Sequence, residues 1–378
     1  MAGIPFNQST IGRTTLKNIT VMIKPASSIC DMRCVYCFYS DVAASREEVS
    51  HGIMTREVAT RLISNIFCVL AAGDHITFAF QGGEPGLAGL DFYLYFVEEV
   101  KKAAPAGVHV HYTIQTNGLM IDNNWCEFFN ENNFLVGLSL DGYAALHNLN
   151  RADAQGKGTF NRVMAAKQVL ELNDVNYNIL CVLTAETSRR ANKLWEFILR
   201  ENIRYIQFIP CLEPFNAQPS KAALTGGRFY QFYLTLFPLW QKEAVKGNII
   251  SIRLFDDLAA LFLAGKRGAC GLTGKCTSQI VVEADGSVYP CDFFVLDEFR
   301  VGNLAEQNLQ EIYEATASCD FINEVRQMPS LCASCPHTAW CRGGCKRMGS
   351  AVYGENCGMR PFLDECLNDL LVTARGLY

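Results

Sequence analysis

Three cysteines in one short loop constrain this chain more than any other feature of its sequence. Cys30, Cys34 and Cys37 have the spacing C-x3-C-x2-C and lie just after the apolar run NITVMIK. A structural zinc site and a fully ligated iron–sulfur cube each need four ligands. Three thiolates would leave one iron of a cube with an open position, where a small molecule can bind. The loop therefore predicts a catalytic cluster; the alternative is a zinc site completed by a distant ligand, for which this spacing is uncommon.

The other cysteines of the chain, which has 17 in all, are partly grouped and partly scattered. Eight form two C-terminal groups, which are Cys270, Cys276 and Cys291, then Cys332, Cys335, Cys341, Cys345 and Cys357. The six scattered ones, most with apolar neighbours, are expected to be small buried core residues: Cys68, Cys126, Cys181, Cys211, Cys319 and Cys366. Grouped cysteines indicate disulfides in secreted proteins, but metal binding or catalysis in the cytosol.

Charge and composition exclude several classes of protein. The formal net charge is −5, so no basic surface indicates a nucleic-acid partner. The N-terminus lacks the charged-then-apolar pattern of a secretory signal, and no apolar run approaches the length that spans a bilayer. We therefore expect a cytoplasmic protein without membrane association. Apolar residues make up 49% of the chain, enough for a large globular core.

Strand-like and helix-like segments alternate over the first 210 residues. Strands are predicted at 19–24, 75–80, 108–114, 134–140, 177–183 and 205–209, with helical stretches such as 55–72 and 159–173 between them. Near-continuous apolar strands separated by helices indicate a parallel sheet covered on both faces. Six such units, where a closed barrel has eight, predict an α/β fold with a partial (β/α)6 TIM-like barrel.

The texture of the sequence changes near residue 250, where we place a domain boundary. Residues 1–250 would form the barrel, and residues 251–378 a cysteine-rich domain with a β-hairpin around Asp285 and Gly286. Polar and glycine-rich turns follow the predicted strands, among them QGGEP, QTNG, DG and PCLEP. Such turns gather at the C-terminal edge of parallel strands, so we expect one shared site beside the three-cysteine loop.

These motifs together resemble a known family. CDMRCVYC resembles the signature of the radical S-adenosylmethionine (SAM) enzymes, and QGGEP resembles their Gly-Gly-Glu-Pro motif. The C-terminal cysteine spacings resemble the SPASM extension. MIKPASSICDMRCVYCFY, FAFQGGEPGLAGL, QTNGLMID, FLVGLSLDG, HNLNR, NILCVLT and VVEADGSVYPCDFFVLD are similar to the anaerobic sulfatase-maturating enzymes along nearly the whole chain. One departure is Gly86, where a threonine is expected.

The resemblance implies SAM and three [4Fe–4S] clusters as cofactors. Cys30, Cys34 and Cys37 would hold the cluster that binds SAM. The first auxiliary cluster would take Cys270, Cys276, Cys291 and Cys345, and the second Cys332, Cys335, Cys341 and Cys357, so the two sets interleave along the chain. On spacing alone, a pair of zinc ribbons is the alternative for these eight cysteines.

The implied activity is the oxidation of a cysteine or serine in a sulfatase polypeptide to Cα-formylglycine. A 5′-deoxyadenosyl radical made from SAM would remove a hydrogen atom from the substrate Cβ. The implied partners are that polypeptide and an electron donor such as a flavodoxin or ferredoxin. A related enzyme that installs a thioether or carbon–carbon crosslink in a peptide is the alternative, and a non-catalytic metal-binding module is a third hypothesis.

The resemblance also assigns the residues of the site. Asp292 would be the catalytic proton acceptor, assisted by Tyr39; by its sequence context alone it would be a turn or capping residue. The SAM contacts would be Tyr36, Gly83, Glu84, Ser139, Arg151 and Leu212. Gln81, Gln115 and Asn117 lie at strand ends and would bind SAM or the peptide. A guanidinium suits the SAM carboxylate, although an exposed surface arginine is the alternative for Arg151.

Overall fold

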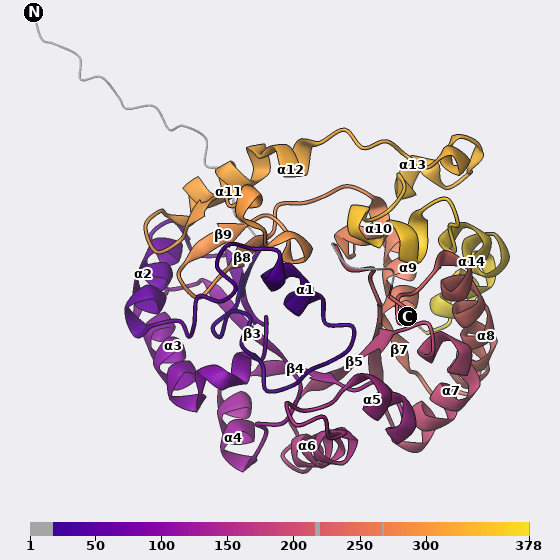
Figure 1. Ribbon diagram of the computed structural model, residues 1–378, viewed down its shortest axis with the longest axis horizontal. Helices are drawn as coiled ribbons and strands as arrows, with labels where there is room; N and C mark the ends of the chain where they lie inside the picture. The colour runs from indigo at the N-terminus through magenta and orange to yellow at the C-terminus, as the bar shows by residue number, and fades with distance from the viewer. Residues whose placement is uncertain (1–17, 216–219, 267, 378) are drawn as a thin grey trace, which may run out of the picture.

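The computed structural model describes residues 18–215, 220–266 and 268–377, which form one twisted ten-stranded sheet with helices outside it (Figure 1). The strand order is β10-β9-β8-β1-β2-β3-β4-β5-β6-β7, and β1 to β7 are all parallel. The strands are β1 (Asn18–Ile23), β2 (His75–Phe80), β3 (His109–Thr116), β4 (Phe134–Ser139), β5 (Tyr177–Leu183), β6 (Tyr205–Pro210), β7 (Ser251–Ile252), β8 (Ile280–Val282), β9 (Ser287–Tyr289) and β10 (Gly302–Asn303).

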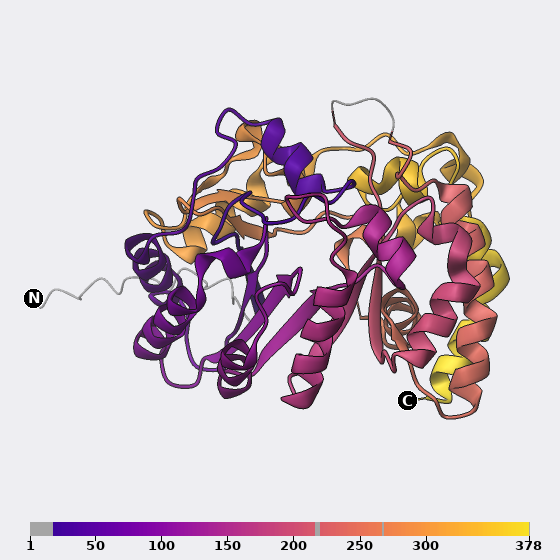
Figure 2. The same ribbon diagram turned by 60° about the horizontal axis from the view of Figure 1, so that its bottom comes forward.

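Helices cover the outer face of this curved sheet, and the first helix lies across one end of the barrel instead (Figures 1 and 2). The α-helices of the described residues are α1 (Phe38–Ala44), α2 (Arg56–Phe67), α3 (Leu90–Ala103), α4 (Asn123–Glu131), α5 (Ala144–Asn150), α6 (Phe160–Leu172), α7 (Ala191–Arg200), α8 (Gly226–Val245), α9 (Arg253–Ala264), α10 (Cys270–Thr273), α11 (Leu309–Ser318), α12 (Asp320–Asn323), α13 (Thr338–Cys341) and α14 (Met359–Arg375). None of them combines the length and the hydrophobicity needed to cross a membrane.

The helix α2 shows how the sequence builds this layer. Thr55 precedes it in an extended conformation, and its hydroxyl accepts a hydrogen bond from the amide of Val58, at 3.2 Å. Its buried residues recur every three or four positions, which places them on one face of the helix: Ala59, Leu62, Ile63, Ile66 and Phe67. That face packs on the sheet, where Phe67 meets Phe78 of β2 edge to face. Periodicity and a capping residue therefore define the element.

The six predicted strands are confirmed, each within two residues at either end, and the predicted hairpin is the β8–β9 pair. The sequence analysis did not predict how the sheet continues. The short β7 extends it beyond β6, and β8 pairs in parallel with β1, so the cysteine-rich part adds strands to the barrel sheet. The division into residues 1–250 and 251–378 stays a proposal, and the two parts share one sheet.

The scattered cysteines follow the expectation only in part. Four of them are buried, namely Cys126, Cys181, Cys211 and Cys366. Cys319 is half-buried, and Cys68 is exposed at the C-terminal end of α2, so the prediction of a core position for Cys68 is wrong. It lies after Phe67, the last buried residue of that helix, where the turn already faces solvent. All described cysteines are free thiols.

Candidate active site

The three-cysteine loop lies between β1 and α1 and is fixed by backbone contacts with the QGGEP turn. The amide of Gly83 donates to the carbonyl of Ser27, and that of Glu84 to the carbonyl of Ile29, both at 2.8 Å. A Cβ atom on Gly83 would lie 2.1 Å from the Ile29 oxygen, so no other residue fits there. The glycines of this motif therefore allow one backbone to lie directly on another.

A second contact fixes the other side of the same loop. Arg33 donates its amide to the carbonyl of Ala152 at 2.8 Å, and Val35 donates to the carbonyl of Asn150 at 3.0 Å, at the C-terminal end of α5. The loop is therefore bonded to β2 and to α5 along the backbone. Such a rigid support holds the thiols in place without relying on flexible side chains.

One cavity at this end of the barrel collects all the residues that the sequence analysis assigned to SAM. Its wall includes Cys30, Cys34, Cys37, Tyr36, Tyr39, Gln81, Gly83, Glu84, Gln115, Asn117, Ser139, Arg151 and Leu212. They come from the ends of six different strands, as expected for a site at the C-terminal edge of a barrel. Their role as SAM contacts stays a proposal, which this convergence supports.

A buried aspartate that the sequence analysis did not single out organises one wall of the cavity. The Oδ2 atom of Asp141 accepts a hydrogen bond from the Tyr36 hydroxyl and lies 3.1 Å from Nε of Arg151. Its Oδ1 atom accepts from the amide of Val182 at 2.9 Å. Arg151 is itself buried, which excludes the exposed surface arginine considered above. The only sequence signal for Asp141 is its place in the DG turn after β4.

The carboxylate of Glu84 is committed to the protein rather than open to a ligand. It accepts hydrogen bonds from Gly86 N (2.9 Å), Thr116 Oγ1 (2.8 Å) and Asn117 N (2.7 Å). Burial raises the pKa of Glu84 to about 7, against these three donors, which favour the charged form. Glu84 therefore connects the QGGEP and QTNG turns, and the backbone next to Gly83 is left to face the cavity. The side chain of Asn117 is similarly engaged, because it donates to Asp31 in the cysteine loop at 2.7 Å.

The eight C-terminal cysteines form two sets in space, and these are the interleaved sets expected above. Cys270, Cys276, Cys291 and Cys345 line one cavity, of about 340 Å³. Cys332, Cys335, Cys341 and Cys357 line another. Within each set the thiols are close enough to raise one another's pKa, as Cys345 does for Cys291 and Cys357 does for Cys341. The grouping supports the proposed ligand sets.

All three cysteine sets fit groups larger than one ion. In the part of the chain that the structure describes, no three His, Cys, Asp or Glu side chains converge closely enough to share a single metal ion. The sulfur atoms surround cavities instead, a donor arrangement that suits iron–sulfur clusters. Burial raises the pKa of Cys30 to about 12 and that of Cys34 to about 11, so binding a metal group there must release protons.

Asp292 lies where the SAM-side cavity and the first auxiliary cavity meet. It lines the auxiliary cavity, and it accepts a hydrogen bond at Oδ2 from the hydroxyl of Tyr39, which lines the other cavity, at 2.8 Å. Nε2 of Gln81 is 3.5 Å from the same oxygen. Burial raises the pKa of Tyr39 well above its ordinary value, so its hydroxyl keeps the proton that it donates. The turn or capping alternative for Asp292 does not describe these contacts, although the residue does begin a short 3-10 turn.

Comparisons with known proteins agree with this geometry. Residues 25–191 match the Radical SAM superfamily, and residues 274–336 match an iron–sulfur cluster-binding domain, SPASM. A cysteine-type anaerobic sulfatase-maturating enzyme of Clostridium novyi is 42% identical over 334 residues, which cover 88% of this chain and 89% of that protein. A serine-type enzyme of Klebsiella aerogenes is 29% identical over 340 residues, with 89% and 82% covered.

Solved structures extend the likeness to three dimensions. The structure described as native anSMEcpe with bound AdoMet and Cp18Cys peptide superposes with a TM-score of 0.88 at 37% identity, covering 96% of this chain and all of that one. SuiB of Streptococcus suis shares the fold alone, with a TM-score of 0.62 at 16% identity and coverage of 90% of this chain and 76% of that one. The chain therefore belongs to the anaerobic sulfatase-maturating enzymes, which are radical SAM oxidoreductases with SAM and [4Fe–4S] clusters as cofactors.

Proposed function

We propose that the protein oxidises a cysteine or serine side chain of a sulfatase polypeptide to Cα-formylglycine. The carrying observation is the place of Asp292 between two cavities, one lined by the three-cysteine loop and one by the first auxiliary set. The two cavities also share Pro210 and Phe293 in their walls. A substrate side chain at this junction would lie between the site where a hydrogen atom is removed and a site that can take an electron.

The balance of the reaction states what the protein must supply. Oxidising a serine to an aldehyde removes two electrons and two protons, and a cysteine gives a thioaldehyde that water must then hydrolyse. When bound, SAM with its cluster supplies a carbon radical that removes one hydrogen atom from the substrate Cβ, and an auxiliary cluster supplies an acceptor for the second electron. The remaining proton, on the thiol or hydroxyl, needs a base within hydrogen-bond reach.

Asp292 suits that base. Its hydrogen bond from Tyr39 and its contact with Gln81 fix the carboxylate beside the SAM-side cavity, and a carboxylate is charged at neutral pH unless its surroundings prevent it. Tyr39 orients Asp292 and does not compete for the proton, because its own pKa is raised. Around SAM, Arg151 would pair with the carboxylate of the cofactor, held in place by Asp141. Ser139, Gln115 and Leu212 complete that wall.

The substrate and the reductant are proposed from the comparisons and from the chemistry. A polypeptide substrate is supported by the peptide named with the anSMEcpe structure. The higher identity with a cysteine-type relative, 42% against 29% for a serine-type relative, favours a cysteine as the target. Reducing the cluster requires an electron donor, for which we propose a flavodoxin or ferredoxin.

The direct test is an anaerobic assay with a synthetic sulfatase peptide. We expect one 5′-deoxyadenosine for each aldehyde formed, measured by chromatography and by mass spectrometry of the peptide. A thioether or carbon–carbon crosslink would instead lower the peptide mass by two hydrogens and leave no group that reacts with hydrazide. That outcome would favour the crosslinking alternative. Zinc in place of iron, with no visible absorption, would contradict both enzyme hypotheses.

A further inference from the structure

Lys24, the residue that follows β1, is a buried cation that no motif assigned to the site. Its side chain is 3% exposed, and its Nζ atom lies 3.0 Å from Oδ1 of Asp292. The same ammonium lies 4.5 Å from the centre of the Tyr39 ring. The Asp292 carboxylate is therefore held at one oxygen by a cation and at the other by the Tyr39 hydroxyl.

The backbone around Lys24 leaves its side chain little freedom. Its amide donates to the carbonyl of Val282 in β8 at 2.8 Å, so the residue is tied to the cysteine-rich part of the sheet. Its aliphatic stem lies against the QGGEP turn, because a Cβ atom on Gly82 would be 3.1 Å from both Cβ and Cγ of Lys24. The φ angle of Gly82 is +123°, a conformation that favours glycine. The turn that supports the cysteine loop thus also confines this lysine.

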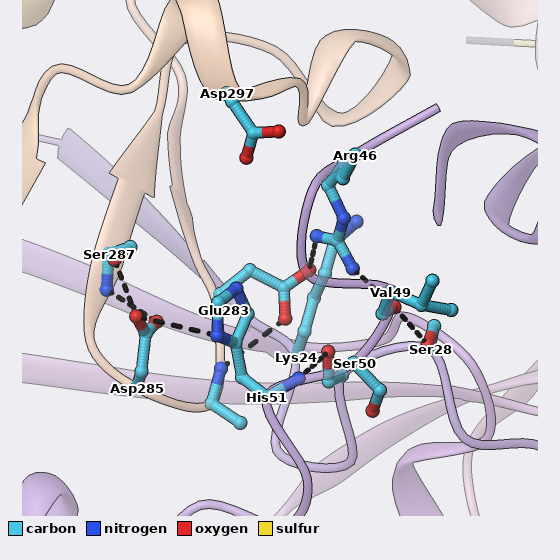
Figure 3. A network of polar contacts seen from close by, with 12 residues as sticks. Lys24, Ser28, Arg46, Val49, Ser50, His51, Glu283, Asp285, Ser287 and Asp297 are labelled. Carbon is cyan, nitrogen blue, oxygen red and sulfur yellow. Dashed lines mark hydrogen bonds and ion pairs between the residues drawn. The ribbon is translucent and has the colours of Figure 1, made fainter. Parts of the chain in front are cut away.

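A second buried ion pair lies behind Lys24, as Figure 3 shows. Arg46 and Glu283 are 2.7 Å apart, with both side chains 2% exposed. Burial acts to raise the pKa of Glu283, but Lys24 and Arg46 together hold it below its ordinary value. Glu283 comes from the β8–β9 hairpin and Arg46 from the segment after α1, so the pair joins the two parts of the chain.

Four buried charges of alternating sign therefore run from the reaction site into the protein: Asp292, Lys24, Glu283 and Arg46. Two cations balance two anions. Removing one partner from such a set leaves an uncompensated buried charge, which shifts its neighbours. A buried lysine that only supported the fold would need one carboxylate, whereas this one faces two, and one of them is the proposed proton acceptor.

We propose that Lys24 is a positioning residue for the reaction: its ammonium fixes the Asp292 carboxylate at the junction of the two cavities, and the Glu283–Arg46 pair fixes Lys24. The inference rests on the proposed function of Asp292. Lys24 lies outside the walls described for both cavities and acts through Asp292 alone. Its loss should therefore impair aldehyde formation more than SAM cleavage.

The test is the yield of formylglycine per 5′-deoxyadenosine in the Lys24→Met variant, assayed anaerobically with the reconstituted full chain and a sulfatase peptide. Methionine keeps the length and removes the charge. The yield should fall by roughly ten- to a hundredfold, the scale expected when a reacting group is misplaced by about 1 Å. Because the yield counts only molecules that cleave SAM, partial misfolding cannot produce this result. Lys167→Met is the matched control: Lys167 is also buried, is paired with Glu171 at 2.7 Å on α6, and should keep the wild-type yield.

A double-mutant cycle separates positioning from a general structural role. In the Asp292→Asn background, Lys24→Met should change the yield by less than about threefold, because residues that act as one unit are not additive. A repeat of the full loss in that background would overturn the inference, as would a wild-type yield in the single variant or a complete loss of SAM cleavage. If the wild-type protein itself makes no formylglycine, the proposed function fails instead, so the two failures are distinguishable.

Discussion

The barrel loop and the cysteine-rich segment arrange thiols in opposite ways. Cys30, Cys34 and Cys37 lie within eight residues, and backbone hydrogen bonds to two neighbouring elements fix the loop. The eight C-terminal cysteines are spread over residues 270–357, in short helices and turns, and each set combines residues that are far apart in the sequence. A site built on one loop is rigid because its scaffold is; a site built from distant segments depends on everything between them.

The difference has a functional counterpart. The loop site must leave one metal position open and present it to a cofactor, so its support comes entirely from behind, through the QGGEP turn and the end of α5. The auxiliary sets have four thiols each, so the polypeptide can enclose them. Asp292 directly follows an auxiliary cysteine yet faces the barrel side, which makes it the covalent link between the two regions.

The largest effect should follow from removing the loop thiols. Replacing Cys30, Cys34 and Cys37 together by alanine should abolish SAM cleavage, because no other set leaves an open metal position. The auxiliary sets lie elsewhere, so about eight of the roughly twelve irons expected for three cubes should remain. Iron and sulfide analysis beside a 5′-deoxyadenosine assay checks this. Wild-type release of 5′-deoxyadenosine would contradict the assignment of the loop.

Asp292→Asn should have the next largest effect. Asparagine keeps the size of the side chain but cannot take up a proton at neutral pH. The aldehyde product should fall by roughly two to four orders of magnitude, the usual contribution of a positioned base, while SAM cleavage continues. Mass spectrometry of the peptide and chromatography of 5′-deoxyadenosine measure the two separately. If both activities are lost together, Asp292 supports the cofactor or the fold and is not the base.

The sequence alone predicted the parts of this molecule that depend on local pattern. Six strands and the Asp285–Gly286 hairpin followed from apolar runs and turn residues, and the loop cysteines from their spacing. The walls of the SAM-side cavity were assigned by family resemblance, and the structure does bring those residues together. Parallel strands explain this success, because the topology places all of their C-terminal ends at one edge.

What the sequence could not predict depends on contacts between distant segments. Asp141 and Lys24 carry no spacing signal; each is significant only because the fold places it next to a residue from another strand or domain. The same holds for the pairing of β8 with β1, since three residues of a hairpin give no indication of a partner about 260 positions away. The exposure of Cys68 depends on where α2 ends, which periodicity defines poorly.

The interleaving of the auxiliary sets can be tested by iron content in paired variants. Cys276→Ala with Cys345→Ala should remove one cluster, about four irons, because both cysteines line the same cavity. Cys332→Ala with Cys345→Ala should remove two clusters, about eight irons, because these cysteines line different cavities. If the sets were contiguous in sequence instead, the second pair would remove only one cluster. The comparison uses the same Cys345 substitution in both variants, so its local effect cancels.

The smallest effect concerns Gly86, where the barrel motif departs from the expected threonine. A Cβ atom at this position would lie 2.5 Å from Cγ of Met120, so the methionine of the QTNG turn occupies the space that a larger residue would need. Gly86→Thr alone should destabilise the fold by about 1–3 kcal/mol, the usual effect of overpacking. Combining it with Met120→Val should recover most of that loss, because the shorter side chain vacates the site. Thermal unfolding of the anaerobic protein measures both, and the Met120→Val single variant is the control. Equal stability of Gly86→Thr and the wild type would show that the turn yields easily, and that the barrel side is less rigid than its backbone contacts indicate.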